Sequence, residues 1–339
     1  MSKRDPGTIR LGRARTTPGR QGPPWGIERR EVPRIPHWAG MMFAFGAGIA
    51  HALSFAPLEL WWLQVVATGA LVVLLAHARA PVAARRGWAF GFGWLAAGLW
   101  WIFISLHRYG GLSEFLSTLA VGLLAALLAL YYAAAAALWA SLRRRSVAWD
   151  AALFAACWLL AELARGRFLT GFPWIAGGYA HTSGPFAAWA PWIGVYGIGA
   201  LAAWTAASIG LGLMGLRNGR WGFLRSLGPL LVPLALLAGG ELLPATFTRS
   251  TGMLTVSLLQ TDVPQDVKFD DAHIAEALRW HLAEFNAAPG QLVVTPESSI
   301  PVLADQVPPQ QWLDLQRPFD APGRGALVGM FLGDDEHGY

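Results

Sequence analysis

The sequence FLSTLAVGLLAALLALYYAAAAALWASL, residues 115–142, contains no charged side chain. A helix needs about 20 predominantly apolar residues to cross the hydrocarbon core of a bilayer. The stretch exceeds that length, so it predicts a transmembrane helix. The 18 tryptophans of the chain agree with this prediction, because tryptophan is enriched where a membrane protein meets the bilayer interface.

Further apolar stretches lie on both sides of this one. The chain is 54% hydrophobic and only 14% charged, whereas soluble domains have about 25% charged residues. The apolar stretches are 38–56, 58–78, 87–106, 115–142, 147–164, 193–216 and 227–243. The fifth and seventh are short or interrupted by Gly and Pro. A buried helix of a soluble protein would explain any one of them, but the succession favours a multi-pass α-helical membrane domain of seven spans, residues 37–247.

The loop charges predict how these spans are oriented. Loops on the cytoplasmic side of a membrane protein carry an excess of basic residues. Nine arginines fall in one set of alternate loops and three in the other. The nine are Arg79, Arg85, Arg86, Arg143, Arg144, Arg145, Arg217, Arg220 and Arg225, and the three are Arg108, Arg165 and Arg167. We therefore expect a cytoplasmic N-terminus, with residues 1–36 as a basic disordered tail, and residues 248–339 on the outer side.

Charged residues return after Thr251, and the apolar runs become shorter. Strands are predicted at 254–260, 292–295 and 326–332, and helices from Asp270 or Asp271 onward and at 309–315. Strands and helices therefore alternate along the chain. The first helix has an apolar face of Ile274, Leu278, Leu282 and Phe285. This order indicates an α/β domain. Because the last strand lies close to Tyr339 with no closing element, we expect the domain to be incomplete.

Two acidic residues are candidates for function. Glu297 directly follows the strand at 292–295, at the edge where α/β sheets place catalytic groups. It is interpreted as a general base or, alternatively, as a solvated loop glutamate or a helix N-cap. Glu162 lies inside the fifth apolar stretch. Acids in such positions are functional or paired, and Arg165 or Arg167 is the expected partner.

Three segments together resemble the apolipoprotein N-acyltransferases, a family of bacterial inner-membrane enzymes that complete lipoprotein maturation. The first comprises ELAR (162–165), GFPW (171–174), GY (178–179) and PWIGVYG (191–197). The second is LQTDVPQDVKF (259–269), and the third is VTPESSIP (294–301). They occur in the family's order after the apolar stretches, and this combination is more specific than any one of them.

The resemblance implies a multi-pass inner-membrane protein whose periplasmic domain is the N-terminal part of an α/β nitrilase-like α-β-β-α sandwich with a Glu–Lys–Cys triad. In the family, the triad cysteine takes an acyl chain from a membrane phospholipid as a thioester. It then passes the chain to the N-terminal diacylglyceryl-cysteine of an apolipoprotein. Glu297 matches the triad glutamate, the general base. The resemblance implies no cofactor, no metal and no nucleic acid, and a monomer.

The sequence also departs from the family pattern. The triad lysine and cysteine have no counterpart among the 339 residues, so we expect the chain alone to be inactive. Lys268 belongs to the second segment, and Cys157 lies in an apolar stretch where a small core residue is expected. Phe269 stands where the family usually has Trp, and it is expected to keep an aromatic wall for the substrate. Thr295 replaces another Trp.

Phe172, Trp174 and Tyr179 are expected just outside the membrane. They either line the entrance for the acyl chain or act only as interfacial anchors. Two other functions stay open for the whole chain. One is a membrane-tethered amidase of the carbon–nitrogen hydrolase superfamily, and the other is a non-catalytic membrane protein that naturally ends at Tyr339.

Overall fold

A computed structural model describes residues 36–144, 146–217, 223–244, 246, 248–265 and 267–333. Nearly all of the predicted basic tail at 1–36 lies outside these residues, as do Arg145 and Arg220. The chain divides into two compact units. The first comprises residues 1–107 and 112–245, and the second comprises 108–111 and 246–339.

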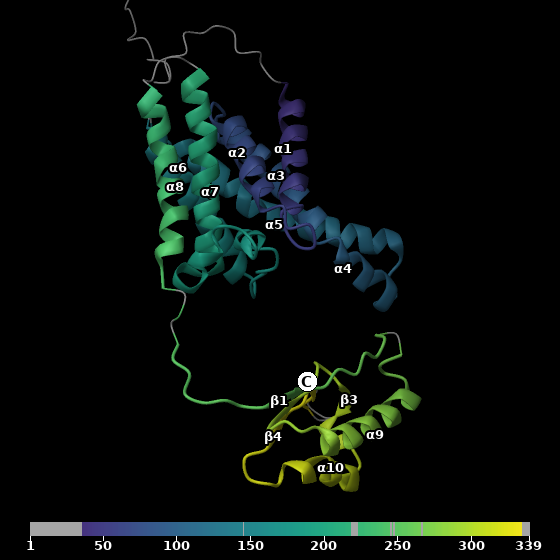
Figure 1. The fold of residues 1–339 in the computed structure, drawn as a ribbon. Coiled ribbons are helices and arrows are strands. Elements are labelled where there is room, and N and C mark those ends of the chain that lie inside the picture. The colour runs from purple at the N-terminus through teal and green to yellow at the C-terminus, as the bar shows by residue number, and fades with distance from the viewer. Residues whose placement is uncertain are drawn as a thin grey trace, which may run out of the picture. The chain divides into compact units, whose positions relative to one another are not determined.

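The first unit is helical, and a helix forms in each of the seven predicted apolar stretches (Figure 1). The helices are α1 (His37–Ala52), α2 (Trp61–Leu75), α3 (Ala80–Gly98), α4 (Trp101–Ile104), α5 (Glu114–Leu142), α6 (Val147–Arg167), α7 (Ala190–Arg217) and α8 (Phe223–Leu242). A π-helical turn (Ser105–Tyr109) follows α4, and the short 3-10 helices η2 (Gly177–His181) and η3 (Ala187–Trp189) precede α7.

Length and apolarity support fewer spans than the sequence predicted. Among the described residues, three helices are long and apolar enough to cross a membrane, namely Glu114–Leu142, Val147–Arg167 and Ala187–Gly215. Ala80–Gly98 together with Trp101–Tyr109 makes a fourth if the 50° bend between them lies within one span. Helices α1 and α2 have 16 and 15 residues, which is short for a straight span.

The predicted loop position of some arginines is wrong. Arg85 and Arg86 lie inside α3, because arginine favours helix and its long side chain can reach polar groups from within one. The Arg86 guanidinium donates to the carbonyl of Leu74 at 2.5 Å. Arg143 donates to the carbonyls of Leu75 and Ala78 at 2.8 and 2.9 Å. These two arginines thus donate to carbonyls of the last turn of α2, at Leu74 and Leu75, and to that of Ala78 just beyond it.

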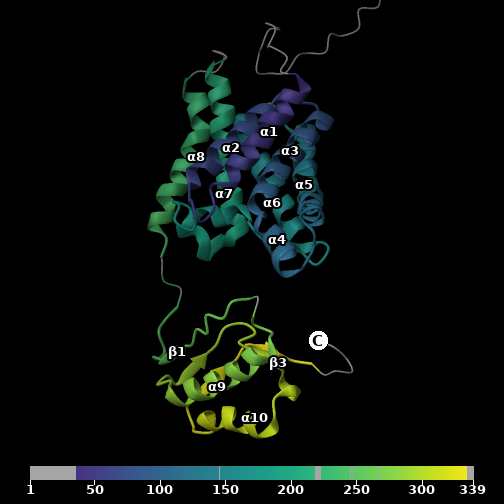
Figure 2. The ribbon, with the colours of Figure 1, turned by 90° about the vertical axis from the view of Figure 1, so that its right-hand side faces the viewer.

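The helices of the first unit pack around an aromatic core. Helix α3 contacts both α1 and α5, while α6 contacts α5 and α7, and α7 also packs against α2 and α8 (Figures 1 and 2). The rings of Trp94 and Trp158 stack with centroids 5.9 Å apart, and Tyr132 lies 5.0 Å from each of them. Gly48 permits the closest approach, because a side chain there would collide with the α3 backbone at Phe90.

The second unit contains the predicted alternation of strands and helices. Its elements are β1 (Val256–Leu258), α9 (Asp271–Ala287), β2 (Leu292–Val294), β3 (Ile300–Leu303), α10 (Pro309–Gln316), β4 (Gly325–Leu327) and β5 (Met330–Phe331). One parallel sheet has the order β1-β2-β4, and β3 pairs with β5 in a second, two-stranded sheet. The N-cap of α9 is Asp270, as predicted, although its side chain makes no capping hydrogen bond.

The last predicted strand, 326–332, is in fact two strands in different sheets, and β3 was not predicted. The chain leaves β4 and passes beside the segment that follows β2. A side chain at Gly329 would collide there with the carbonyl of Pro296. The prediction missed this change of sheet because Val328 and Met330 continue the apolar run without a break.

The two faces of the three-stranded sheet differ. In register, Ser257, Val293 and Ala326 lie on one face, where Val293 is buried in a core with residues of α9 and α10. Leu258, Val294 and Leu327 are aligned on the other face. On that open face Leu258 is 77% exposed and Leu327 60% exposed. Helices therefore cover one face of the sheet, and the other is an exposed apolar surface.

Candidate functional site

Glu297 lies in a turn at the carboxyl end of β2, where the sequence predicted it. Three hydrogen bonds fix the backbone on either side of it. The hydroxyl of Ser299 has one proton, which it shares between the hydroxyl oxygen of Thr295 at 2.7 Å and the carbonyl of Gly329 at 3.2 Å. The Gly329 N–H donates to the same Thr295 oxygen at 3.0 Å. Thr295 and Ser299 are buried, so these bonds are protected from water.

The carboxylate of Glu297 is exposed. Its backbone carbonyl accepts a hydrogen bond from the ammonium group of Lys268 at 3.1 Å. Ser298 follows with a φ of 48°, a left-handed conformation that few residues adopt without support from their surroundings. The turn is thus held by the hydrogen bonds of Thr295 and Ser299 and by that of Lys268. Glu297 itself stays exposed, so its carboxylate can act on another group.

Phe269, the predicted aromatic wall, is adjacent to Lys268 in the chain. Its ring is 52% exposed and lies 6.2 Å from the ring of Phe331 in β5. The structure therefore brings the second and third family-like segments together through Lys268. The ring of Phe269 remains accessible beside them.

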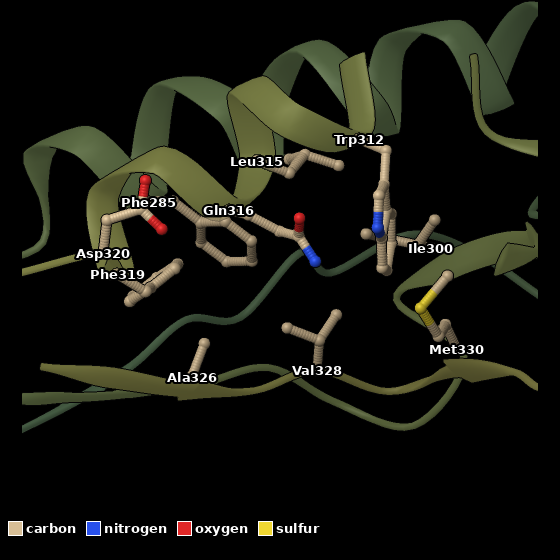
Figure 3. A pocket seen from close by; sticks show the side chains of 10 residues that line it. All are labelled: Phe285, Ile300, Trp312, Leu315, Gln316, Phe319, Asp320, Ala326, Val328 and Met330. Carbon is tan, nitrogen blue, oxygen red and sulfur yellow. The ribbon is translucent and has the colours of Figure 1, made fainter. Parts of the chain in front are cut away.

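A hollow of about 450 Å³ lies elsewhere in the second unit, between α10 and β4 (Figure 3). It is lined by Phe285, Ile300, Trp312, Leu315, Gln316, Phe319, Asp320, Ala326, Val328 and Met330. Glu297 is not among these residues. The lining is mostly apolar and has no pair of acid and base, so we do not assign catalysis to this hollow.

The aromatic residues predicted at the membrane face lie in the first unit, in the loop of residues 168–179 that follows α6. The rings of Phe172 and Trp174 meet edge to face at 5.0 Å. Trp174 is also 5.0 Å from Trp101. Trp174 is 51% exposed, and Tyr179, on η2, is 50% exposed. The structure thus groups Phe172 with Trp174 and leaves both Trp174 and Tyr179 accessible.

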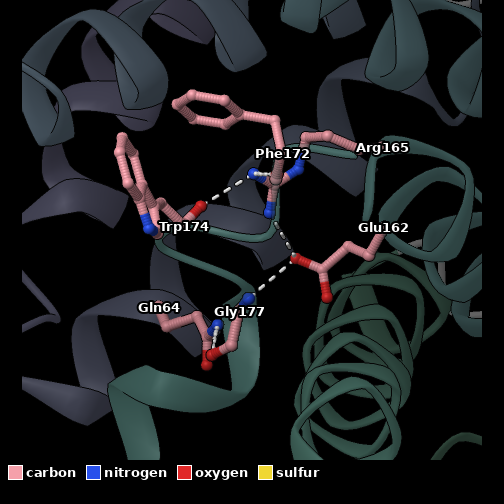
Figure 4. Close-up of polar contacts among 6 residues, drawn as sticks. All are labelled: Gln64, Glu162, Arg165, Phe172, Trp174 and Gly177. Atoms are coloured by element: carbon pink, nitrogen blue, oxygen red, sulfur yellow. Dashed lines mark hydrogen bonds and ion pairs between the residues drawn. The ribbon is translucent and has the colours of Figure 1, made fainter. Parts of the chain in front are cut away.

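Arg165 holds the backbone of this loop (Figure 4). One guanidinium nitrogen, Nη1, donates to the carbonyls of both Phe172 and Trp174, at 2.8 and 2.7 Å. The Phe172 N–H donates in return to the carbonyl of Arg165 at 2.7 Å. The guanidinium is buried and lies 4.0 Å from Glu162 Oε1. Of the two partners expected for Glu162, the structure therefore selects Arg165.

Glu162 and Gln64 hold the far end of the same loop. Glu162 Oε1 accepts from the N–H of Gly177 at 2.7 Å, and Gln64 Nε2 donates to the Gly177 carbonyl at 2.7 Å. The Oε1 atom of Gln64 lies 2.7 Å from Nε2 of His181. Because Gln64 uses its NH₂ group on Gly177, His181 donates here through Nε2. All four side chains of this network, including Arg165, are at most 2% exposed.

Burial lowers the pKa of His181 to about 4. The imidazole is consequently neutral near pH 7, with its proton on the nitrogen that faces Gln64. A neutral ring suits a site that already holds the guanidinium of Arg165, because a second positive charge would be desolvated at high cost.

The sequence did not identify Gln64, His181 or the role of Lys268. Gln64 could have been found as an amide inside an apolar stretch, since polar side chains there need partners. No comparable pattern marks His181, whose neighbours in the sequence are small and polar. Lys268 was assigned to its motif, but the contact with Glu297 depends on a turn that brings distant segments together.

Comparison with known proteins shows a clear relationship. The family model described as "Apolipoprotein N-acyltransferase N-terminal domain" matches residues 47–208. A protein named apolipoprotein N-acyltransferase from Ralstonia nicotianae is 41% identical over 297 residues, which are 86% of this chain. Proteins of the same name from Verminephrobacter eiseniae and Pseudomonas putida are 41% and 39% identical, over 88% and 86% of the chain.

This chain spans little more than half the length of these relatives. The aligned regions cover 55% of the Ralstonia protein and 58% of each of the other two. The alignments extend well beyond the matched N-terminal domain, so the similarity is not confined to apolar helices.

Proposed function

This chain belongs to the apolipoprotein N-acyltransferase family, and from that membership we propose that the protein transfers an acyl chain from a membrane phospholipid to an apolipoprotein. The acceptor is the α-amine of the N-terminal diacylglyceryl-cysteine. The observation that carries the proposal is the fixed turn of Glu297 at the carboxyl end of β2. It presents an exposed carboxylate from a rigid backbone, as a general base requires.

The proposed chemistry has two half-reactions through one thioester. Glu297 takes the proton of a cysteine thiol, the thiolate attacks the ester carbonyl, and the lysophospholipid leaves with a proton. The lipoprotein amine then attacks the thioester and releases the thiol. A lysine stabilises the oxyanion in each half. We propose that this lysine and cysteine lie outside the 339 residues. Lys268 donates to a backbone carbonyl, and Cys157, the one cysteine of the sequence, is buried in α6, so neither is proposed for these roles.

The proposal includes the architecture that the family implies. Seven spans would carry the chain from a cytoplasmic N-terminus to a periplasmic catalytic domain in the bacterial inner membrane. The catalytic domain would be a monomeric nitrilase-like α-β-β-α sandwich. The open apolar face at Leu258 and Leu327 supports this arrangement, since a second β layer packed there would remove that surface from water.

Phe269, Phe172, Trp174 and Tyr179 are proposed to contact the substrates. Phe269 is next to the residue that holds Glu297, and an exposed ring there can bound the space around the reacting groups. The other three expose aromatic surface, which can receive an acyl chain from the bilayer.

The test is thioester formation from radiolabelled phospholipid in the protein extended to the length of its relatives. We expect the change Glu297→Gln to reduce the rate by at least about 100-fold, because it removes the general base without changing the size of the side chain. Glu276→Gln, at an exposed carboxylate of α9, is the matched control and should react normally. Near-normal acylation of the Glu297 variant would refute the assignment, and no thioester should form on the 339-residue chain alone.

A further inference from the structure

We propose that Glu162, Arg165 and Gln64 are positioning residues that fix the loop of residues 168–179 so that it can receive an acyl chain on Phe172 and Trp174. This inference rests on the proposed function. It assigns a role to buried polar groups that the proposed chemistry does not use.

The first observation is how Arg165 determines the direction of the two rings. Its Nη1 atom donates to the carbonyls of Phe172 and Trp174. Both carbonyls therefore face the buried guanidinium. Figure 4 shows both rings directed away from Glu162. A guanidinium can make these bonds together because its donors are fixed in one plane, which an ammonium group cannot reproduce.

The second observation is that the loop is anchored independently at its other end. Gly177 donates its N–H to Glu162 and accepts from Gln64 through its carbonyl. A Cβ atom at this glycine would lie 3.0 Å from Gln64 Nε2 and 3.2 Å from Glu162 Oε1. Side chains of α6 and α2 thus hold Gly177 through its N–H and its carbonyl, and a Cβ atom there would press on both of them.

The third observation is that the backbone of the loop is strained at three positions. Leu169, Thr170 and Ile175 have φ values of 54°, 69° and 50°. Side chains other than glycine rarely adopt this left-handed conformation, and it persists only where the surroundings impose it. The loop would therefore relax without its anchors. Strain of this kind is concentrated at sites that bind ligands.

The fourth observation indicates a ligand rather than a purely structural role. The anchored loop exposes large apolar side chains, since Phe168 is 64% exposed and Leu169 83% exposed, in addition to Trp174. Large apolar side chains that stay exposed on an anchored loop offer surface to which an acyl chain can bind. A rigid apolar surface loses little conformational freedom when a flexible acyl chain binds to it, so anchoring strengthens binding.

The mobility of the loop tests the anchoring on this chain itself. A nitroxide spin label is attached at Leu169→Cys in a Cys157→Ala background and observed by electron paramagnetic resonance. We expect Glu162→Ala and Arg165→Met to raise the mobile fraction at least about twofold, because each removes an anchor. Glu162→Gln keeps an acceptor for the Gly177 N–H and should restore most of the order.

Asp150→Ala is the matched control. Asp150 is another buried acid of α6, and it accepts a hydrogen bond from the Arg144 N–H near the opposite end of the helix. Its removal should destabilise the bundle but leave the label at position 169 ordered. Equal mobility in the Glu162→Ala, Arg165→Met and parent proteins overturns the inference. So does the same increase in Asp150→Ala.

Phospholipid binding tests the purpose of the anchoring. Phosphatidylethanolamine with a diazirine in its acyl chain is titrated and photo-cross-linked, and label on peptides covering 168–180 is measured. Trp174→Ala should reduce this labelling, while Glu162→Ala and Arg165→Met should raise the half-saturating concentration about fivefold at an unchanged plateau.

The Trp174 variant and the anchor variants distinguish a failure of the proposed function from a failure of the positioning role. Labelling that is insensitive to Trp174→Ala contradicts the acyl-chain contact in the proposed function, and with it the purpose of the anchors. Labelling that depends on Trp174 but is unchanged in Glu162→Ala and Arg165→Met leaves the proposed function intact and overturns the positioning role.

Discussion

Lys268 donates a hydrogen bond from its ammonium group to the backbone carbonyl of Glu297, at 3.1 Å. The contact joins two segments that lie 29 positions apart in the chain. It leaves the Glu297 carboxylate unpaired by Lys268, so the lysine holds the backbone of the proposed general base without neutralising its charge.

Replacing Lys268 should therefore loosen the turn. We expect Lys268→Met to increase hydrogen exchange of the amides at 297–300, and to slow thioester formation in the extended protein by roughly tenfold through misplacement of the base. Lys268→Arg keeps a donor, so its hydrogen exchange and its rate should lie between those of the parent and of Lys268→Met. Exchange mass spectrometry measures the first effect, and unchanged exchange in Lys268→Met would show that the contact does not hold the turn.

The hydroxyl of Thr295 should contribute strongly to the stability of the turn around Glu297. Thr295→Val keeps the shape but leaves the buried Gly329 N–H and the Ser299 hydroxyl without their shared acceptor. We expect a loss of about 1–3 kcal/mol in the local free energy of opening, measured by hydrogen exchange at Gly329 and Met330. Thr295→Ser keeps the oxygen and serves as the control. A cost below about 0.5 kcal/mol in Thr295→Val would contradict this account.

Polar substitutions on the open face of the sheet should have opposite effects in the 339-residue chain and in the extended protein. Leu258→Ser with Leu327→Ser should reduce self-association of the 339-residue chain, because it removes exposed apolar surface. The same pair should destabilise the extended protein, in which we propose that a second layer covers this face. Light scattering and thermal unfolding measure the two effects. If the extended protein tolerates both changes, the face is not an interior surface.

His181 predicts a loss of stability in mild acid. Its folded pKa of about 4 lies below the unfolded value of 6.5, so the unfolded chain binds a proton first as the pH falls. Above about pH 6.5 the ring is neutral in both states and the folded protein keeps its full stability. The free energy of unfolding then falls progressively between pH 6.5 and 4, as the unfolded chain binds the proton. His181→Asn cannot titrate but can still donate to Gln64. The parent should therefore lose more thermal stability than His181→Asn between pH 7.5 and 5, and parallel curves would disprove the assignment.

The fold was predictable where one pattern decided it. Each of the long apolar runs forms a helix, as expected of segments long enough to approach the thickness of a bilayer. The alternation of strands and helices after Thr251 gave α9, α10 and most strands. The prediction failed where long-range contacts decide. Val328 and Gly329 continue an apolar run, yet the close approach of Gly329 to Pro296 ends one strand pairing and starts another.

The candidate site was predictable to a similar degree. The location of Glu297 was predicted because its motif directly follows a strand, and that of Phe172 and Trp174 because their motif follows an apolar stretch. The roles of all three in function stay predictions. Gln64 and His181 were not found. Their role comes from the folded distance between α2 and the loop after α6, and no local pattern in the sequence encodes that distance.

The pair of Glu162 and Arg165 also bears on how α6 enters the bilayer. The two residues are three positions apart on one helix, so they become neighbours as soon as that helix forms. A helix leaving the translocation machinery can thus present a carboxylate and a guanidinium already matched, before the loop that follows α6 has emerged. The penalty for inserting either charge alone is then reduced at the earliest step of biogenesis.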